Sequence, residues 1–517
     1  MAAPNVKLAE SLELLKKAQD SGKHVFQSTD LPRVHRERLV AGGFLRDIVK
    51  GWYMVSKPQE HDGDSTAWYA SFFEFVAAYC NIRFGADWYL SPELTLHLHA
   101  GSTAIPRQVQ VHAKAGQNNN LALKFNTALF DYQAKDFAPT GDVVVCNGLR
   151  LLAPAAALVR AAPTFYVQQP LDVQIVLAQI RDVSDLLAKL LDGGQSVVAG
   201  RIAGALRAVD REDDADRIVK AMRASSYVVN AQNPFDKPPA ILMSSRGESP
   251  CSLRVRAMWD NMREHVVAAF PPAPGVPADR AAYLQDVNDR HVEDAYHSLS
   301  IEGYKVSTEL IAKIAAGAWD PEVNPQDKND RNAMAAKGYH QAFLQVRASV
   351  QTILQQQTDP GEIVRRDHHD WYLQLFEPSV RAGIIEAKHL AGYRSWPVYI
   401  RNARHVPPAH EAVRDAMPTF FDLLTRETEP AVRAVLGHFI FVYIHPYMDG
   451  NGRMARFLMN AMLASGGYPW TVIHVDDRAE YMAALDQASA EGNIQPFAHF
   501  VGRCVEAQMT AGFTAAR

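Results

Sequence analysis

The apolar positions in the C-terminal half of the chain recur at helical spacing. From about residue 279 onward, apolar side chains return every three or four residues, which is the period of an amphipathic helix. Two of these stretches, residues 431–444 and 457–464, are almost wholly apolar and flank a short polar loop. The pattern predicts a mainly helical domain over residues 278–517, with two buried helices joined by that loop.

The first 60 residues predict a helix, a short helix, a second full helix and a hairpin. Residues 44–49 and 52–55 are strand-like runs on either side of Lys50-Gly51, a typical hairpin signal. This order resembles the winged helix of AbiEi-type antitoxins. Four basic side chains then fall on or beside the recognition helix: Arg33, His35, Arg36 and Arg38. Two interpretations stay open, DNA binding through residues 1–60 and protein contact with these side chains in solvent.

Residues 61–270 mix helical and strand-like patterns and contain no nucleophile or metal constellation. Residues 155–162 and 173–191 predict helices. A Pro-rich stretch, residues 270–277, predicts a domain boundary. The fold class is therefore mainly α, with a winged-helix domain (1–60), an α+β domain of unknown role that is similar to AbiEi proteins (61–270), and a helical domain (278–517).

Composition narrows the class of protein. The 517 residues carry a formal net charge of −4, so any contact with DNA has to be local. The four cysteines show no CxxC pair, which argues against a disulfide scaffold or a zinc finger. The chain shows no signal-peptide pattern and no apolar window of membrane-spanning length. We therefore expect a cytoplasmic protein with no membrane span.

The polar loop and the start of the next helix gather residues suited to binding a polyphosphate. This stretch reads His-Pro-Tyr-Met-Asp-Gly-Asn-Gly-Arg-Met-Ala-Arg, and its chemically active positions are His445, Asp449, Gly450, Asn451, Gly452, Arg453 and Arg456. Glycines on both sides of an asparagine allow successive backbone N–H groups to point into one anion-binding concavity. The positive end of the following helix adds to this attraction.

The charged residues around the concavity complete the argument. Arg453 and Arg456 lie in the first turns of a helix, where the dipole disfavours cations, so their presence makes sense if a polyphosphate neutralises them. Asp449 suits a hard cation such as Mg2+ that bridges phosphates. His445, at the end of the preceding helix, is placed to act as a general base.

This stretch resembles the signature of the Fic (Fido) family, H-x-F-x-[D/E]-G-N-G-R-x-x-R. It departs from the signature only at Tyr447, where the family usually has Phe, and the added hydroxyl needs a hydrogen-bond partner. The resemblance covers roughly residues 280–510. It implies an all-helical Fic bundle with a β-hairpin flap and a protein adenylyltransferase activity.

The resemblance implies a role for each residue. A Ser, Thr or Tyr hydroxyl of a target protein attacks the α-phosphorus of ATP, and His445 takes its proton. Asp449 holds Mg2+, the amides of residues 450–452 stabilise phosphate charge, and Arg453 and Arg456 hold the β- and γ-phosphates. On the adenosine side the resemblance places Asn460 and Tyr481. A flap hairpin within residues 396–405, with Val398, Tyr399 and Ile400, holds the target segment by backbone hydrogen bonds.

A second motif resembles the inhibitory pattern of the same family. Ser298 and Glu302 are four residues apart on a helix predicted near residues 290–303, and Gly303 is placed to end it. In relatives the glutamate pairs with the second arginine of the signature, which here is Arg456, and takes the γ-phosphate position. At Tyr304 this chain departs from relatives, which often carry Asn. The expected protein is therefore an autoinhibited adenylyltransferase.

Several alternatives remain open at this point. One alternative is a winged-helix DNA-binding regulator, or antitoxin-like protein, that retains a Fic fold without enzymatic activity. The chain is also consistent with a Fic enzyme that removes AMP or uses another nucleotide donor. The expected partners are a protein substrate, which includes the chain itself, and the resemblance leaves room for a homodimer.

Overall fold

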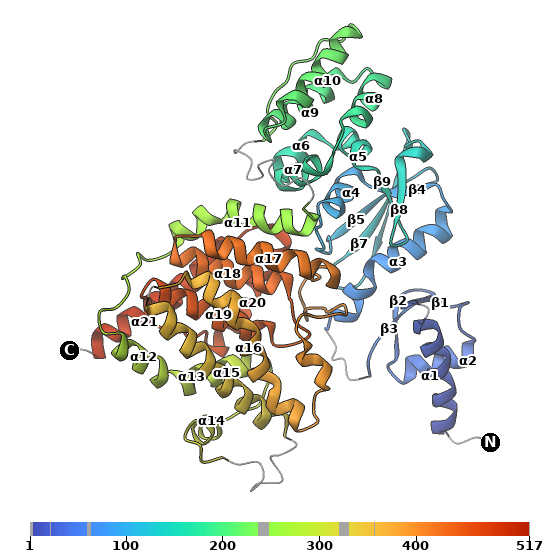
Figure 1. Cartoon of the computed structure of the whole chain (residues 1–517). Helices are drawn as coiled ribbons and strands as arrows, with labels where there is room; N and C mark the ends of the chain where they lie inside the picture. Colours follow the sequence, from blue (N-terminus) through green and yellow to red (C-terminus); the bar gives the residue numbers. More distant parts are fainter. Residues whose placement is uncertain are drawn as a thin grey trace. The chain divides into compact units, whose positions relative to one another are not determined.

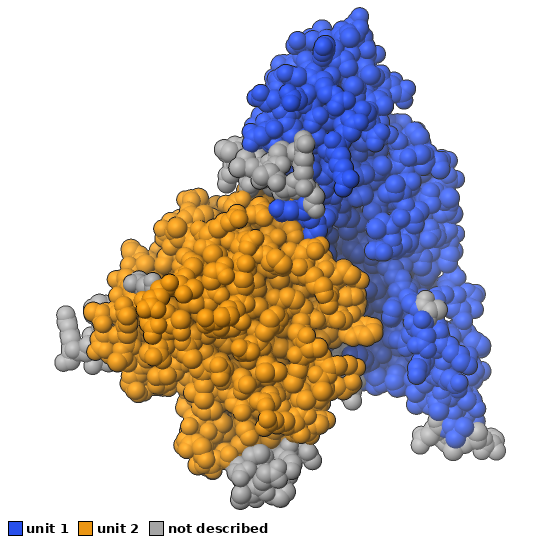
Figure 2. Space-filling view, viewed as in Figure 1, with its two compact units in different colours: residues 1–250, 399–406 blue, residues 251–398, 407–517 orange. Residues whose placement is uncertain are grey.

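A computed structural model describes residues 4–20, 22–58, 64–235, 248–319, 330–355 and 357–515. The chain forms two compact units (Figure 2). The first contains residues 1–250 and 399–406, and the second contains residues 251–398 and 407–517. The elements are labelled in Figure 1.

The first unit begins with a small helix-and-sheet motif. Its elements are α1 (Pro4–Asp20), β1 (Val25–Gln27), α2 (Arg33–Ala41), β2 (Leu45–Val49) and β3 (Trp52–Val55). The three strands are antiparallel in the order β1-β3-β2, and the predicted hairpin turns at Lys50-Gly51, with Gly51 at φ 81°. The predicted short helix is absent from the described residues here, because Val25 and Phe26 pair with β3 instead.

A second, larger sheet follows in the same unit. The elements are α3 (Thr66–Phe84), β4 (Trp88–Leu90), α4 (Pro92–His99), β5 (Gln108–Ala113), β6 (Asn119–Ala122), β7 (Ala128–Gln133), η1 (Thr140–Asp142), β8 (Val143–Cys146) and β9 (Leu149–Leu152). The sheet has the strand order β4-β5-β7-β6 and contains one parallel pair, β5 and β7. Trp68, Phe72 and Phe75 of α3 are fully buried against this sheet's core. Strands β8 and β9 form a separate two-stranded antiparallel sheet.

Six helices complete this unit: α5 (Pro154–Arg160), α6 (Pro163–Gln168), α7 (Pro170–Gln179), α8 (Ser184–Asp192), α9 (Ser196–Ala208) and α10 (Glu212–Ala224). The single helix predicted over residues 173–191 is wrong, because the chain leaves the helix at Ile180 and starts again at Ser184. The Asp182 carboxylate accepts a hydrogen bond from the Ser184 N–H at 3.1 Å and so supports the new start.

The regular elements that the structure describes in the second unit are all helices. Its elements are α11 (Pro250–Ala269), α12 (Arg280–Asp289), α13 (His291–Ile301), α14 (Thr308–Ala315), α15 (Arg331–Leu354), α16 (Pro360–Arg381), η3 (Ala387–Ala391), α17 (His410–Arg426), α18 (Pro430–Ile444), α19 (Asn451–Ser465), η4 (Val475–Asp477), α20 (Arg478–Glu491) and α21 (Gln495–Ala515). The two apolar runs of the sequence form α18 and α19, which pack against each other (Figure 1). The mainly α fold class is confirmed.

The division between the units falls before α11 and not at the Pro-rich residues 270–277. The reason is that α11 packs within the helical unit. The Trp259 indole N–H and the Arg263 guanidinium both donate to the Glu427 carboxylate, at 3.2 and 3.0 Å. No described helix combines the length and the apolar character that a membrane span requires.

Candidate active site

The loop between α18 and α19 places His445 at a helix end in an uncommon backbone conformation. His445 follows the last residue of α18 and lies in the left-handed region, at φ 53° and ψ 61°. Its Nδ1 atom lies 3.2 Å from the carbonyl oxygen of Val442. A proton on Nδ1 makes that hydrogen bond and leaves Nε2 as the free acceptor, the form that a general base requires.

The charge state of this histidine follows from its surroundings. Burial lowers the pKa of His445 to about 4, although the hydrogen bond to Val442 works in the opposite direction. The ring is therefore neutral at physiological pH and able to accept a proton.

Arg394 holds the backbone on which His445 is mounted. Its guanidinium is 1% exposed. Nε donates to the carbonyl oxygen of His445 at 2.8 Å, Nη2 to those of Ile444 and Pro408, and Nη1 to that of Trp396 at 3.3 Å. Its own N–H donates to the carbonyl oxygen of Pro446 at 2.8 Å. Burial lowers the pKa of Arg394 to about 10. A guanidinium buried among carbonyl groups thus satisfies the last carbonyls of α18.

Tyr447 and Asn451 fix the shape of the loop. The Tyr447 ring is fully buried and stacks on Tyr372, with 3.8 Å between ring centroids. Its hydroxyl finds the partner that the sequence demanded in His369 Nδ1, at 3.0 Å. The Asn451 side chain accepts from the Tyr447 N–H at 2.9 Å and donates to the Tyr447 carbonyl oxygen at 2.8 Å. Asn451 therefore acts as a brace across the turn.

Gly450 is the N-cap of α19 and has no room for a side chain. It lies at φ 79°, and a Cβ atom there would stand 2.7 Å from the ring of Phe376. Its N–H donates to the Asp449 carboxylate at 2.6 Å. That carboxylate is 53% exposed, so it faces solvent at the mouth of the loop.

Arg453 lies between two aromatic rings. The centre of its guanidinium is 5.1 Å from the ring centroids of both Tyr304 and Phe376, within the range of cation–π attraction. It also contacts Asp449, 3.4 Å away. Tyr304, which departs from the family pattern, therefore supplies one wall for an arginine of the signature.

The second motif ends helix α13 as the sequence predicts. Glu302 is the residue that caps α13, and Gly303 follows at φ 86°. Gly303 N–H donates to Ser300 and Tyr304 N–H to Leu299, at 3.0 and 3.1 Å. This pair of bonds is the Schellman ending, which favours glycine at the left-handed position.

The end of α13 contacts Arg456 at three points. Arg456 Nη2 lies 2.7 Å from the Glu302 carboxylate and 3.1 Å from the carbonyl oxygen of Ser298, and Arg456 Nε donates to the Ser298 hydroxyl at 2.8 Å. The arginine is 3% exposed and the glutamate 28%. This is a charge-assisted pair with little solvent screening.

Glu302 also reaches the start of α19. A Cβ atom added at Gly452 would overlap a carboxylate oxygen of Glu302. The carboxylate thus lies beside the free N–H groups and the positive dipole end of α19, where an anion is favoured. A side-chain anion of the protein occupies the concavity that the sequence predicts for phosphate.

The site retains donors suited to a larger anion. Within the described residues, neither Arg453 Nε nor Arg456 Nη1 has a hydrogen-bond partner, although both atoms are buried. Buried donors without partners are uncommon, and phosphate oxygens would satisfy them. Asp449 offers one exposed carboxylate, which suits Mg2+ held jointly with phosphates. The residues present therefore fit Mg2+ and ATP.

Two residues expected on the adenosine side are instead buried in the core. Both polar atoms of the Asn460 side chain bond to the backbone of Thr471, at 2.7 and 3.0 Å. The Tyr481 hydroxyl lies 2.8 Å from His438 Nε2 and its ring is 1% exposed. Asn460 thus holds the segment before α20, and Tyr481 packs in the interior beside Arg456. Contact of either residue with a nucleotide stays a prediction.

The expected flap hairpin is wrong in its secondary structure. Residues 396–405 form a turn and a single β-bridge, between His405 and Ala104. Three prolines lack the N–H group that a β-ladder needs: Pro397, Pro407 and Pro408. The carbonyl oxygen of Arg404 is already bonded, because it accepts from the N–H of Ile105 at 2.9 Å. Residues 399–406 thus belong to the first unit, with Tyr399 and Ile400 among them, whereas Val398 belongs to the second.

The basic residues of α2 are engaged within residues 1–60. Arg36 donates to the carbonyl oxygen of Ser28, Arg38 donates to that of Lys7 at 3.3 Å, and His35 bonds to the Ser11 hydroxyl. Arg33 pairs with Glu37 on the same helix. These contacts stabilise the small motif and reduce the basic surface available to DNA.

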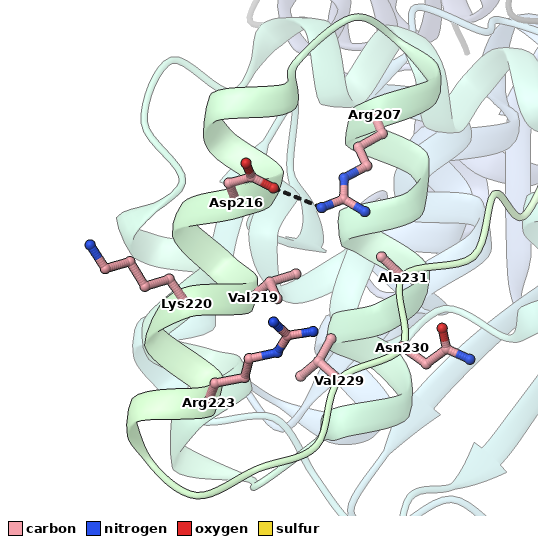
Figure 3. Close-up of a pocket in the computed structure, with 8 residues that line it drawn as sticks. All are labelled: Arg207, Asp216, Val219, Lys220, Arg223, Val229, Asn230 and Ala231. Carbon is pink, nitrogen blue, oxygen red and sulfur yellow. Dashed lines mark hydrogen bonds and ion pairs between the residues drawn. The ribbon is translucent and has the colours of Figure 1, made fainter.

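A hollow outside the candidate site lies between α9 and α10 (Figure 3). Its charged lining consists of Arg207, Asp216, Lys220 and Arg223, and Arg207 donates to Asp216 at 2.7 Å. Figure 3 shows Lys220 pointing away from the other three. The lining contains no nucleophile beside a base, so we assign it no chemistry.

Comparison with known proteins supports the resemblance to Fic proteins. Residues 345–463 match the model of the Fic/DOC family. The chain is 46% identical over 123 residues to "Protein adenylyltransferase Fic" of Nematostella vectensis, covering 23% of this chain and 28% of that protein. It is 38% identical over 230 residues to the protein of the same name in Drosophila grimshawi, covering 44% of each. A solved structure of Fic-1 (residues 134–508) from C. elegans aligns with 67% of this chain and 88% of that one, at 20% identity and a TM-score of 0.39.

The matched range has a clear limit. It contains the loop, both arginines and Asp449, but not α13. The chain spans less than half the length of these two curated relatives.

Proposed function

We propose that this chain is an autoinhibited protein adenylyltransferase that transfers AMP from ATP to a hydroxyl group of a protein. The observation that carries the proposal is the position of the Glu302 carboxylate, which bonds to Arg456 and lies against Gly452 at the start of α19. The Glu302 carboxylate therefore lies at the N-terminus of α19, the kind of position at which proteins bind phosphate groups. The names of the similar proteins supply the reaction class.

In the proposed reaction, Nε2 of His445 takes the proton of the target hydroxyl. The hydroxyl oxygen bonds to the α-phosphorus, the bond from that phosphorus to the oxygen bridging to the β-phosphate breaks, and pyrophosphate leaves with those electrons. The N–H groups of residues 450–452 stabilise the charge on the phosphate oxygens. Arg453 holds the β-phosphate and Arg456 the γ-phosphate. Mg2+, held by Asp449, supplies charge neutralisation.

Inhibition follows from competition for one guanidinium. While Arg456 is bonded to Glu302 and Ser298, a γ-phosphate has to displace the carboxylate or bind elsewhere. ATP bound elsewhere presents its α-phosphorus out of line with His445, and such misplacement is costly for the reaction. A signal that moves the end of α13 would release the enzyme.

The target segment is proposed to bind along residues 398–400. This role rests on the family resemblance, because Val398, Tyr399 and Ile400 form an irregular stretch and not the sheet edge to which an extended peptide usually adds. The target class is a protein with an accessible hydroxyl side chain, which includes this chain itself. We propose no DNA-binding role for α2, because three of its four basic side chains bond within residues 1–60. The fourth, Arg33, is exposed beside Glu37.

The test compares two labels in one nucleotide. Glu302→Gly protein is incubated with Mg2+ and ATP labelled at either the α- or the γ-phosphate. The proposal predicts covalent label from the α-position alone, with a mass increase equal to one AMP. Label from the γ-position would indicate phosphate transfer and overturn the proposal.

A further inference from the structure

Three metal-ligating side chains meet on the face of α13 beside its inhibitory end. Glu293 and His297 are one turn apart on α13, and His474 lies just before η4. One potential ligand atom from each lies within 4.8 Å of the other two. The ring centroids of His297 and His474 are 4.3 Å apart. None of these residues takes part in the site described above.

The set of donors points to a transition metal. Two imidazoles and one carboxylate form a common ligand set for Zn2+, with water completing the tetrahedron. Metal–ligand bonds of about 2.0–2.2 Å place the ligand atoms roughly 3.3–3.6 Å apart, so small side-chain rotations close the observed spacing. Glu293 and His474 are 48% and 40% exposed, which gives an ion a path from solvent.

The electrostatic surroundings suit a cation. Asp476 and Asp477 follow His474 in the chain and contribute negative potential at His297.

Metal binding by His297 through Nε2 would break one hydrogen bond that its ring makes now. The N–H of Val475 donates to Nδ1 of His297 at 3.1 Å, so the ring proton is on Nε2. Ligation through Nε2 moves that proton to Nδ1 and replaces the bond to Val475 with a metal bond. Ion binding is thereby coupled to the backbone between His474 and Arg478.

That backbone segment already contacts the inhibitory end of α13. Arg478 Nε donates to the carbonyl oxygen of Ile301 at 2.8 Å, directly before Glu302. His297 is followed in the chain by Ser298, which holds Arg456. A metal bridge from α13 to His474 therefore fastens the helix that carries both inhibitory contacts.

We propose that Glu293, His297 and His474 form a Zn2+-class transition-metal site that holds α13 in its inhibitory position. The regulatory part of this inference rests on the proposed adenylyltransferase function, whereas binding of the ion does not. Bound metal would keep Glu302 against Arg456, and its loss would favour the active arrangement.

Binding is tested first, without reference to activity. The full-length protein, stripped of transition metals, is titrated with Zn2+ by calorimetry and followed by thermal unfolding. Wild type is expected to bind one more ion than His474→Ala or His297→Ala and to show a metal-dependent rise in Tm that those variants lack. His499→Ala, which removes an exposed histidine of α21, is the matched control and should behave as wild type. If wild type and His474→Ala bound the same number of Zn2+ ions, the proposed metal site would be disproved.

Regulation is tested second, with α-labelled ATP and excess Mg2+. Zn2+ is expected to reduce labelling by wild type several-fold but to leave Glu302→Gly and His474→Ala unchanged. If Zn2+ bound but did not change labelling by wild type, the regulatory role would be disproved, and the proposal of a metal site would stand. Absence of label in every variant would defeat the proposed function, while the titration would still decide the metal site.

Discussion

Arg394 offers the sharpest test of how the site is built, because it touches His445 only through the backbone. Replacing it with methionine keeps a long apolar side chain of similar reach but removes every donor. Four carbonyl groups lose their side-chain partner, among them those of His445 and Ile444. The change therefore loosens the mounting of the catalytic ring without altering the ring.

The expected magnitude follows from the number of bonds lost. Each net hydrogen bond from a buried donor contributes about 0.5–1.5 kcal/mol, so four of them amount to roughly 2–6 kcal/mol. Removing a buried cation that lacks a carboxylate partner in the described residues offsets part of that loss. We expect Arg394→Met to lower the free energy of unfolding by about 2–4 kcal/mol. A displacement of His445 by about 1 Å would cost roughly 100-fold in rate.

The assay separates positioning from folding. In the Glu302→Gly background, Arg394→Met should lower kcat for AMP transfer strongly while leaving KM for ATP nearly unchanged, because the phosphate-binding arginines are untouched. Arg394→Lys, which retains one cationic donor, should recover part of kcat. An increase in KM with kcat unchanged would refute the positioning role, as would wild-type kcat in a folded Arg394→Met protein.

Three further predictions follow from single contacts. Glu302→Gly removes a charge-assisted bond worth about 1.5–3 kcal/mol, so self-labelling should rise roughly 10- to 150-fold. Glu309→Gly, an exposed control on α14, should leave self-labelling unchanged. Equal labelling by Glu302→Gly and wild type would disprove inhibition. Tyr447→Phe removes the buried bond to His369 and should cost about 0.5–1.5 kcal/mol in urea unfolding, with activity nearly retained; a larger loss of activity than of stability would give the hydroxyl a catalytic role. Burial raises the pKa of Asp294 to about 6, above its unfolded value of about 3.9, so its contribution to stability is complete below about pH 4 and falls by about 3 kcal/mol as pH rises to about 6. Asp294→Asn should abolish that slope, and an unchanged pH dependence of unfolding in this variant would contradict the assignment.

The sequence predicted the parts of the site that depend on local chain order. The loop between two apolar helices, the glycine ending α13 and the pair formed by Glu302 and Arg456 are all present. The loop and the helix-ending glycine follow from short-range rules, such as the left-handed conformation that glycine tolerates. The Glu302 pair was reached through the family resemblance, because its partners are 154 residues apart.

Contacts over long sequence distances escaped prediction. Nothing in the pattern around Phe376 indicates that its ring would cover Arg453. Nor does the sequence indicate that the Arg394 guanidinium would lie among the carbonyl groups at the end of α18. The bonds between the Asn460 amide and the backbone of Thr471, in which the amide is both donor and acceptor, were likewise not predicted. These outcomes depend on which buried groups need partners in three dimensions.

The flap failed for a related reason. The hairpin was expected from the family resemblance. Pro397 within residues 396–405, and Pro407 and Pro408 just after them, limit its hydrogen bonds, and the segment at Ala104 and Ile105 bonds to the backbone at Arg404 and His405. Sequence periodicity records which side chains prefer burial and does not record which backbone edges are already paired.

The central claim is that His445 drives AMP transfer which Glu302 restrains. Its most direct test is incorporation of α-labelled ATP with Mg2+ by wild type, Glu302→Gly and Glu302→Gly/His445→Ala, with thermal unfolding to establish that all three are folded. The account predicts weak label in wild type, strong label in the single variant and none above background in the double variant. Strong label that survives the loss of His445 would contradict it.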